Sequence, residues 1–314
     1  MTAAALPDTA GGYRHAAVLY SGRDGFLAQT VPFIRAGVAA GEPTLVVVSA
    51  EKIRALREAL AGDADAVEFA DMEDVGANPA QIIPAWQEFV AVHDGRSLRG
   101  IGEPIYAERG AAELTECQHH ERLLNPALEG SNLFLICPYD SHALPPDVLA
   151  EARCSHPLVH DGIAWDDSAC YDDDRVAGGL FEEPLPEPAG AFEERWFDEG
   201  GLGQLRGLLR DYAADAGLSR ERADNLVLAA GEIVTNSVLH GGGHGILRVW
   251  REDDRVVCEV RDGGRIDDPL IDRRRPLQHQ LGGWGLWIAN QACDLLQLRS
   301  IGGGTVARLH MQLR

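Results

Sequence analysis

A proline-punctuated acidic stretch divides this sequence of 314 residues into two parts. The stretch covers residues 161–191 and contains the run Glu182-Glu183-Pro184-Leu185-Pro186-Glu187-Pro188. Because closely spaced carboxylates and prolines cannot pack into an apolar core, this composition predicts a linker. We therefore expect two folded domains, over residues 13–160 and 192–314, and a chain of this length suits two cores better than one.

The first part alternates short apolar runs with longer amphipathic stretches. The pattern predicts strands over residues 18–20, 45–48, 67–70 and 133–137, and helices over residues 26–40, 50–61, 79–93 and 111–129. Strands that alternate with helices of crossover length are typical of a parallel sheet covered on both faces. We expect an α/β, doubly wound domain.

The second part has a different order of elements. We predict helices over residues 202–216, 219–240 and 284–296, an antiparallel strand pair over 246–251 and 256–261, and strands over 296–300 and 306–312. Ser219 is a good N-cap for the second helix, with Glu221 in its first turn. This part is therefore predicted to be an α+β domain.

Composition excludes several classes of function. The sequence has 49 acidic and 28 basic residues, a net charge of −21, which would repel phosphate backbones and anionic lipids. We expect no direct nucleic-acid binding. No apolar run approaches the length of a membrane span, and Met1–Tyr13 lacks the pattern of a signal peptide, so we expect a cytoplasmic protein. Six cysteines without paired spacing suggest reduced thiols.

Three polar residues interrupt the apolar pattern of the helix that ends at residue 240. Glu232, Asn236 and His240 are spaced four apart, so they lie along one stripe of the helix. A buried carboxylate and amide need partners, and a bound ligand can provide them. Asn236 could give magnesium an oxygen, which would leave Glu232 free to act as a base. The alternative is an amphipathic helix whose polar residues meet solvent.

Two glycine turns flank this helix in the predicted fold. Asp262-Gly263-Gly264 follows a strand, and Leu281-Gly282-Gly283-Trp284-Gly285-Leu286 opens a helix. Glycine allows close approach of the backbone to a phosphate, and a helix N-terminus offers free N–H groups. We therefore expect phosphate to be the ligand at these turns.

The order of these motifs resembles a known family. Glu-x3-Asn-x3-His, Asp-x-Gly, Gly-x-Gly-Leu and Gly302-Gly303-Gly304-Thr305 resemble the N, G1, G2 and G3 boxes of GHKL (Bergerat-fold) ATPases. Within that family, residues 232–241 and 283–290 resemble the serine-kinase anti-sigma factors, whose ATPase domain is like that of histidine kinases. Arg265 and Ile266 stand where a second G1 glycine is common.

The resemblance implies a role for each matching residue. Asn236 would coordinate Mg²⁺, and Glu232 would be the base toward a serine hydroxyl. Asp262 would recognise the adenine amino group of ATP. The other expected ATP-binding residues are His240, Gly264, Gly282, Gly283, Gly285, Leu286 and Thr305. Arg273-Arg274-Arg275 correspond to the ATP lid, where they would contact phosphate or form a solvated charge run.

The first part resembles the MEDS sensory domain. The resemblance lies in Gly102-Glu103-Pro104-Ile105-Tyr106, residues 113–125, Cys137-Pro138-Tyr139-Asp140 and His156-Pro157. It implies a sensor with a degenerate RecA-like fold, and the sequence has no phosphate loop of its own. Several residues could supply metal ligands, or could be ordinary buried thiols and surface imidazoles: His15, Cys117, His119, His120, Cys137, His142, Cys154, His156 and His160.

Together these features predict a two-domain signalling regulator. The resemblance implies an anti-sigma factor that binds Mg-ATP as a homodimer and phosphorylates a serine of a STAS-type anti-anti-sigma partner under control of the sensor. One alternative is a non-catalytic module that sequesters a sigma factor or partner protein when ATP is bound. A second is a histidine kinase that uses His120 as phosphoacceptor, although the strand expected after it argues against the required helical hairpin.

Overall fold

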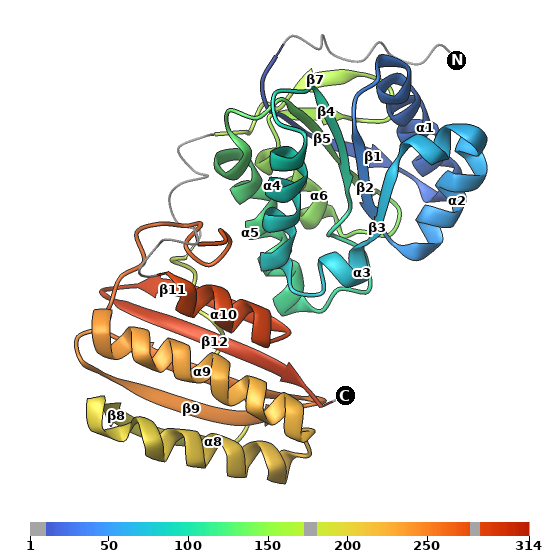
Figure 1. The fold of residues 1–314 in the computed structure, drawn as a ribbon. Coiled ribbons are helices and arrows are strands. Elements are labelled where there is room, and N and C mark those ends of the chain that lie inside the picture. The colour runs from blue at the N-terminus through green and yellow to red at the C-terminus, as the bar shows by residue number, and fades with distance from the viewer. Residues whose placement is uncertain (1–10, 173–180, 277–282, 314) are drawn as a thin grey trace. The chain divides into compact units, whose positions relative to one another are not determined.

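The computed structural model describes residues 11–172, 181–276 and 283–313. The chain divides into two compact units, Met1–Val176 and Ala177–Arg314 (Figure 1). Within the described residues, no helix is both long and apolar enough to cross a lipid bilayer.

The N-terminal unit alternates strands and helices. Its elements are β1 (Arg14–Tyr20), α1 (Gly22–Ala40), β2 (Thr44–Val48), α2 (Ala50–Leu60), η1 (Ala61–Ala66), β3 (Glu68–Asp71), α3 (Met72–Val75), η2 (Pro79–Gln81), α4 (Ile82–Val92), β4 (Leu98–Gly102), α5 (Ala111–Leu128), β5 (Leu133–Asp140), α6 (Pro146–Ser155), β6 (Leu158–His160) and β7 (Trp165–Asp167).

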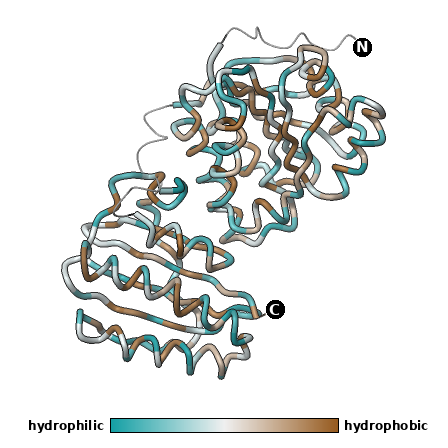
Figure 2. Tube along the Cα trace, viewed as in Figure 1, coloured by the Kyte–Doolittle hydropathy of each residue, from teal (hydrophilic) through white to brown (hydrophobic). Residues whose placement is uncertain are grey.

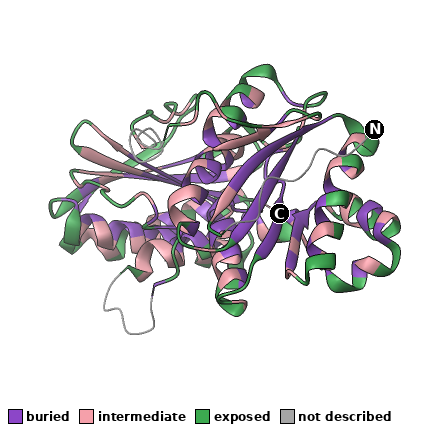
Figure 3. Ribbon diagram, turned by 90° about the horizontal axis from the view of Figure 1, so that it is seen from above, coloured by how far each residue is buried: buried purple, intermediate pink, exposed green. Residues whose placement is uncertain are grey.

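The strands of this unit form one sheet in the order β3-β2-β4-β5-β1-β6-β7. Neighbouring strands from β3 to β6 are parallel, and β7 is antiparallel to β6. Figure 2 shows the central strands as hydrophobic, and Figure 3 shows them buried beneath more exposed helices. Strands with both faces covered require nearly continuous apolar sequence, and this sheet confirms the doubly wound prediction.

Alternate residues of each strand face opposite sides of the sheet. Ala16 and Val18 of β1 pack with Phe26 and Phe33 of α1 and Leu56 of α2 in one apolar core. On the other face, β4 has glycines where α4 lies close. A Cβ on Gly100 would come within 2.8 Å of the Trp86 ring, so only glycine leaves room for that indole.

The C-terminal unit is an antiparallel sheet with helices on one face. Its elements are β8 (Glu193–Asp198), η3 (Glu199–Gly201), α8 (Leu202–Ala216), α9 (Arg220–His240), β9 (His244–Glu252), β10 (Arg255–Asp262), α10 (Trp284–Ala292), β11 (Leu295–Ile301) and β12 (Gly304–Gln312). The strand order is β11-β12-β10-β9-β8. Apolar residues of α8, α9 and α10 pack against inward-facing residues of the strands in a single core. The α+β prediction is confirmed.

The acidic segment 161–191 is not a free linker along its whole length, contrary to our prediction. Trp165–Asp167 pairs with β6 at the edge of the N-terminal sheet. Farther along, Arg299 Nε donates to the Glu183 carbonyl and Arg308 Nη2 donates to the Pro186 carbonyl. Backbone carbonyls and the carboxylate of Glu187 thus attach this stretch to arginines of the C-terminal sheet.

The prediction that all cysteines are reduced thiols is also wrong for one pair. Cys154 of α6 and Cys170 form a disulfide, whereas Cys117, Cys137, Cys258 and Cys293 are buried thiols that are not disulfide-bonded. The pairing escaped sequence analysis because β7 and Cys170 fall in the segment 161–191, which was predicted to be a linker.

Candidate functional site

Helix α9 carries the polar stripe. Ser219 accepts a hydrogen bond from the Arg222 amide and caps the helix, which ends where Gly241 follows His240. Glu232 and Asn236 are half-buried and His240 is exposed. Helix α10 packs along α9, so the stripe lies beside the start of a second helix.

Asp262 is the last residue of β10 and is held by two donors. Ser237 Oγ donates to its Oδ2 at 2.5 Å, and the Gly264 amide donates to its Oδ1 at 2.7 Å. Thr305 of β12 lies opposite Asp262 in the strand ladder. The carboxylate therefore has a fixed orientation, set by α9, the G1 turn and β12.

The turn at Gly241 leaves no room for a side chain. A Cβ there would lie 2.5 Å from Asp262 Cγ. The Gly263 amide also donates to the Gly241 carbonyl at 3.0 Å, which closes the G1 turn over the end of α9. Glycine at 241 is thus required by close packing of the helix end against the carboxylate.

A pocket of about 400 Å³ opens beside Asp262. It is lined by Ile233, Asn236, His240, Gly241, Asp262, Gly264, Arg265, Ile266, Ile271, Gly283, Leu286, Leu298, Thr305 and Ala307. The predicted site residues from α9, the G1 turn, the start of α10 and β12 are thus gathered around one cavity, although they are far apart in the sequence.

Glu232 and Gly285 lie next to the pocket rather than in its lining. A Cβ on Gly285 would come within 3.0 Å of Asn236 Nδ2 and 3.1 Å of Glu232 Oε2. The first turn of α10 therefore lies directly against the polar stripe of α9. Gly283 caps α10 in the left-handed conformation, with φ of 87°, a conformation that favours glycine.

Gly282, one of the expected ATP-binding residues, lies outside the described residues. In the lid segment Arg273 is buried, with 1% of its surface exposed, whereas Arg274 and Arg275 are exposed. A solvated charge run is therefore wrong for Arg273, whose Nε lies 3.8 Å from Asp272 Oδ1.

Sequence analysis missed the apolar wall and the support of the carboxylate. Ile233, Ile266, Ile271, Leu298 and Ala307 line the pocket. Leu298 and Ala307 pair in the β11–β12 ladder, so strand alternation could have placed them on the helix-facing side. Ser237 follows Asn236 directly, but its contact with Asp262 depends on how β10 ends beside α9.

The arrangement suits a flat apolar group with one hydrogen-bond donor. Aliphatic side chains form the walls, and Asp262 is the fixed acceptor among them. Toward α10 the lining becomes polar, with Asn236, His240 and the backbone at Gly283. Free amides at a helix start and an uncharged amide oxygen can serve a phosphate and a hard cation.

The N-terminal unit has its own pocket, also of about 400 Å³. It lies where parallel strands end, with Tyr20 closing β1, Asp140 closing β5 and Glu103 directly after β4. Lys52 Nζ donates to Glu103 Oε2 at 2.6 Å, and Tyr20 Oη donates to Glu103 Oε1 at 2.6 Å. Burial raises the pKa of Glu103, whereas Lys52 and Tyr20 oppose that shift. Ligands of open α/β sheets bind at this edge.

His120 is not placed as a phosphoacceptor. It lies on α5, 1% exposed, and α5 leads into strand β5 of the parallel sheet rather than into a second helix of a hairpin. A phosphoacceptor imidazole must be reached by a nucleotide, so the histidine-kinase alternative through His120 has no support in this fold.

Comparisons with known proteins identify two families. Residues 14–157 match the model of the MEDS domain, the methanogen/methylotroph DcmR sensory domain. Residues 196–311 match the model of the histidine kinase-like ATPase domain. No curated protein matches the chain.

One solved structure similar to this chain is the crystal structure of the RsbU and RsbW domains of Rv1364c from Mycobacterium tuberculosis. The match has 21% sequence identity and a TM-score of 0.31, and covers 39% of this chain. It spans about a third, 32%, of that chain.

Proposed function

Because residues 14–157 belong to the MEDS sensory-domain family and residues 196–311 to the histidine kinase-like ATPase family, we propose that the chain is an ATP-dependent signalling regulator. In this proposal the C-terminal unit binds Mg-ATP and phosphorylates a serine or threonine of a STAS-type anti-anti-sigma partner. The observation that carries the proposal is the single pocket that gathers the polar stripe of α9, Asp262 and the start of α10.

Recognition of adenine rests on Asp262. Ser237 and the Gly264 amide each donate to one of its oxygens, and each carboxylate oxygen can accept a further hydrogen bond. The exocyclic amino group of adenine is the donor that fits, with Thr305 beside it. Aliphatic walls from Ile266 and Leu298 would bury the faces of the base.

The polar end of the pocket suits the triphosphate and its cation. Asn236 would offer its Oδ1 to magnesium, and the amides at Gly283 and the start of α10 would receive phosphate oxygens. Bound magnesium neutralises charge that develops on the transferred phosphoryl group. Glu232 lies one helical turn before Asn236, half-buried and close to Gly285, where it would accept the proton of an incoming hydroxyl.

We propose that the N-terminal pocket receives the input signal. Its position at the ends of β1, β4 and β5 favours a small polar ligand, as does the ion pair between half-buried Lys52 and buried Glu103. A panel of small organic acids and amines, tested by thermal shift of the full chain, should contain a stabilising compound. Lys52→Ala should abolish that shift, and retention of the shift would exclude this pocket.

The kinase proposal is tested by incubating the full chain with Mg-ATP and STAS-domain proteins of the source organism, followed by phosphosite mass spectrometry. Glu232→Gln removes the base while keeping the size of the side chain. Loss of a general base costs about 10²–10⁴-fold in rate. The matched control is Glu221→Gln, an exposed carboxylate in the first turn of the same helix.

Phosphoserine or phosphothreonine on one partner, formed by the unmodified chain and by Glu221→Gln but not by Glu232→Gln, supports the proposal. Transfer that survives Glu232→Gln would contradict the role of Glu232. ATP binding without any phosphate transfer would instead favour the non-catalytic module, in which ATP only gates the capture of a partner.

A further inference from the structure

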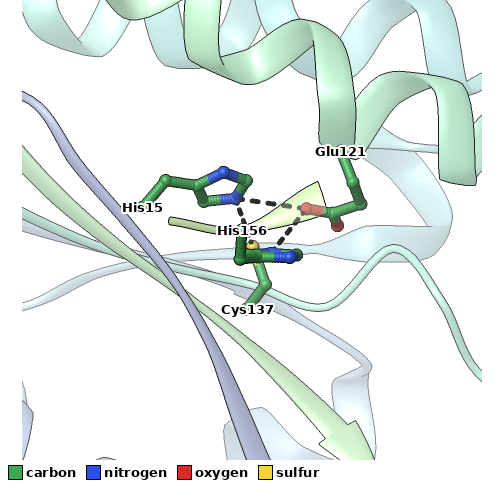
Figure 4. A group of neighbouring side chains, drawn as sticks. All are labelled: His15, Glu121, Cys137 and His156. Atoms are coloured by element: carbon green, nitrogen blue, oxygen red, sulfur yellow. Dashed lines mark hydrogen bonds and ion pairs between the residues drawn. The ribbon is translucent and has the colours of Figure 1, made fainter. Parts of the chain in front are cut away.

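Four buried side chains meet inside the N-terminal unit, away from its pocket (Figure 4). His15 lies on β1, Glu121 on α5, Cys137 on β5, and His156 directly after α6. Each is at most 1% exposed. One nitrogen, oxygen or sulfur atom from each residue lies within 4.8 Å of the others. Sequence analysis named the histidines and the cysteine among several candidates but missed Glu121.

Both imidazoles already use one ring nitrogen as a donor. His156 Nδ1 lies 2.7 Å from the Ala152 carbonyl, which can only accept a hydrogen bond. His15 Nδ1 lies 3.1 Å from Asn125 Oδ1. The Asn125 amide nitrogen donates to the Ser155 carbonyl, so the oxygen must face His15. The protons of both rings are therefore on Nδ1.

The remaining ring nitrogens point at an acceptor. His15 Nε2 and His156 Nε2 each lie 3.2 Å from Glu121 Oε2 (Figure 4). The Cys137 thiol also lies against the Glu121 carboxylate, and its Sγ is 3.3 Å from His15 Nε2, so its one proton can go to either acceptor. With neutral rings, that thiol can serve only one acceptor, so at least one imidazole lone pair still faces the carboxylate, which is unfavourable in a buried site.

Protonation of the rings replaces this conflict with buried charge. The ring centroids of His15 and His156 are 4.0 Å apart, so two imidazolium ions would repel each other and leave a buried positive charge in excess of Glu121. Protonation of His156 alone, with the Cys137 thiol donating to His15 Nε2, would pair these atoms but would place an ion pair in a fully buried site, at a cost in desolvation. A cation between the four side chains removes both problems.

The spacing of the four atoms suits a tetrahedral metal ion. Zinc bonds of about 2.0–2.3 Å at tetrahedral angles place neighbouring ligand atoms about 3.3–3.6 Å apart. His15 Nε2 lies 3.3 Å from Cys137 Sγ, and the two distances from imidazole nitrogen to Glu121 oxygen are 3.2 Å. These three distances are close to metal-bound spacing, and the widest separation in the group, up to 4.8 Å, would have to shorten by about 1 Å when a metal binds.

Charge and surroundings fit the same ion. A divalent cation with the Cys137 thiolate, the Glu121 carboxylate and two neutral imidazoles has no net charge, which suits a fully buried site. Mixed nitrogen, sulfur and oxygen ligands favour zinc over magnesium or calcium. The hydrogen bonds from both Nδ1 atoms are the outer contacts that metal-binding histidines make.

We propose that His15, Glu121, Cys137 and His156 form a zinc site within the N-terminal unit. Zinc binding would displace the thiol proton of Cys137 to solvent as the zinc–sulfur bond forms. The ion would connect strands β1 and β5 to helices α5 and α6, which come from distant parts of the sequence.

The test uses the full chain, stripped with a chelator and then titrated with zinc against a competing chromophoric chelator. The expected result is about one zinc ion per chain. Cobalt(II) titration of the same unmodified chain should give a tetrahedral spectrum with a thiolate charge-transfer band, a readout that depends on no substitution.

Cys137→Ser should remove the thiolate band and weaken zinc binding by more than about 10–100-fold. A loss of that size already follows when a residue that only hydrogen-bonds to a metal ligand is replaced. The matched control is Cys117→Ser, because Cys117 is also a buried thiol of this unit that is not disulfide-bonded, but it lies outside the cluster. Glu121→Gln should weaken zinc binding too, and circular dichroism of each variant establishes that it folds.

Failure of the unmodified chain to take up zinc or cobalt under these conditions would overturn the proposal. It would also be overturned if the cobalt spectrum had no thiolate band, or if folded Cys137→Ser bound zinc as tightly as Cys117→Ser.

Discussion

Ser237 Oγ donates a hydrogen bond of 2.5 Å to Asp262 Oδ2 and so ties helix α9 to the end of strand β10. Ser237 is 1% exposed, which protects this bond from competing water. The helix carries Glu232 and Asn236, and the strand carries the proposed adenine acceptor. The Ser237 hydroxyl thus fixes the position of helix α9 relative to Asp262 in the proposed ATP site.

Ser237→Ala should weaken ATP binding by about 5- to 10-fold, because one hydrogen bond that orients Asp262 contributes about 1 kcal/mol. Isothermal titration with ATP measures the effect. Thr235→Ala is the matched control, since Thr235 Oγ1 donates to the Gly231 carbonyl of the same helix rather than to Asp262. Equal losses in both variants would mean that the Asp262 contact is not responsible.

Gly285→Ala should weaken ATP binding on the order of tenfold. The new methyl group would lie 3.0 Å from Asn236 Nδ2 and 3.1 Å from Glu232 Oε2, so both polar side chains must shift. Gly207→Ala is the control on helix α8, where a Cβ meets nothing within 4 Å and should stabilise the helix. Unchanged ATP affinity in Gly285→Ala would mean that the contact between Gly285 and the polar stripe of α9 does not matter for ATP binding.

Glu259→Ala should destabilise the C-terminal unit by about 3 kcal/mol, the cost of leaving a buried charge without its partner. Glu259 is fully buried and accepts from Arg308 Nη2 and Arg261 Nε, both at 2.6 Å. Urea denaturation measures the change. Glu252→Ala, an exposed carboxylate at the end of β9, should alter stability by less than about 0.5 kcal/mol. Similar midpoints for the two variants would contradict the prediction.

Elements with a strong apolar period were predictable from the sequence. Helix α8 spans Leu202–Ala216, as predicted, and α9 begins after its Ser219 cap. The third helix of this unit ends at Ala292, earlier than expected, because Leu295 and Leu296 belong to β11. An apolar run at a helix–strand junction fits both elements, so sequence alone could not divide it.

Strands β4, β6, β7 and β8 were all missed, and the composition of β4 and β8 hides them. Strand β4 reads Leu-Arg-Gly-Ile-Gly, and its glycines make room for Trp86 while Arg99 is buried with Glu42 as its ion-pair partner. Edge strand β8 is largely charged, and Phe197 is its one buried residue. Burial of these residues depends on tertiary neighbours, which local pattern does not report.

The candidate ATP site was predictable because its residues occur in ordered motifs. The residues that support this site could not be predicted from the sequence. Ser237 and Ile266 act through contacts with residues of other elements, and these contacts exist only in the folded structure. The same holds in the N-terminal unit. Glu121 joins His15 and His156 only because α5 packs over β1 and the end of α6.

The central claim is that the C-terminal unit binds ATP through Asp262, and nucleotide titration of the full chain in the presence of magnesium tests it most directly. The unmodified chain should bind ATP far more tightly than GTP, because guanine has a carbonyl oxygen, an acceptor, where adenine has the 6-amino group that would donate to the fixed carboxylate. Asp262→Asn should lose about 10- to 100-fold in ATP affinity, as expected for a hydrogen bond to a charged acceptor. Equal binding of ATP and GTP, or undiminished ATP affinity in Asp262→Asn, would contradict the account.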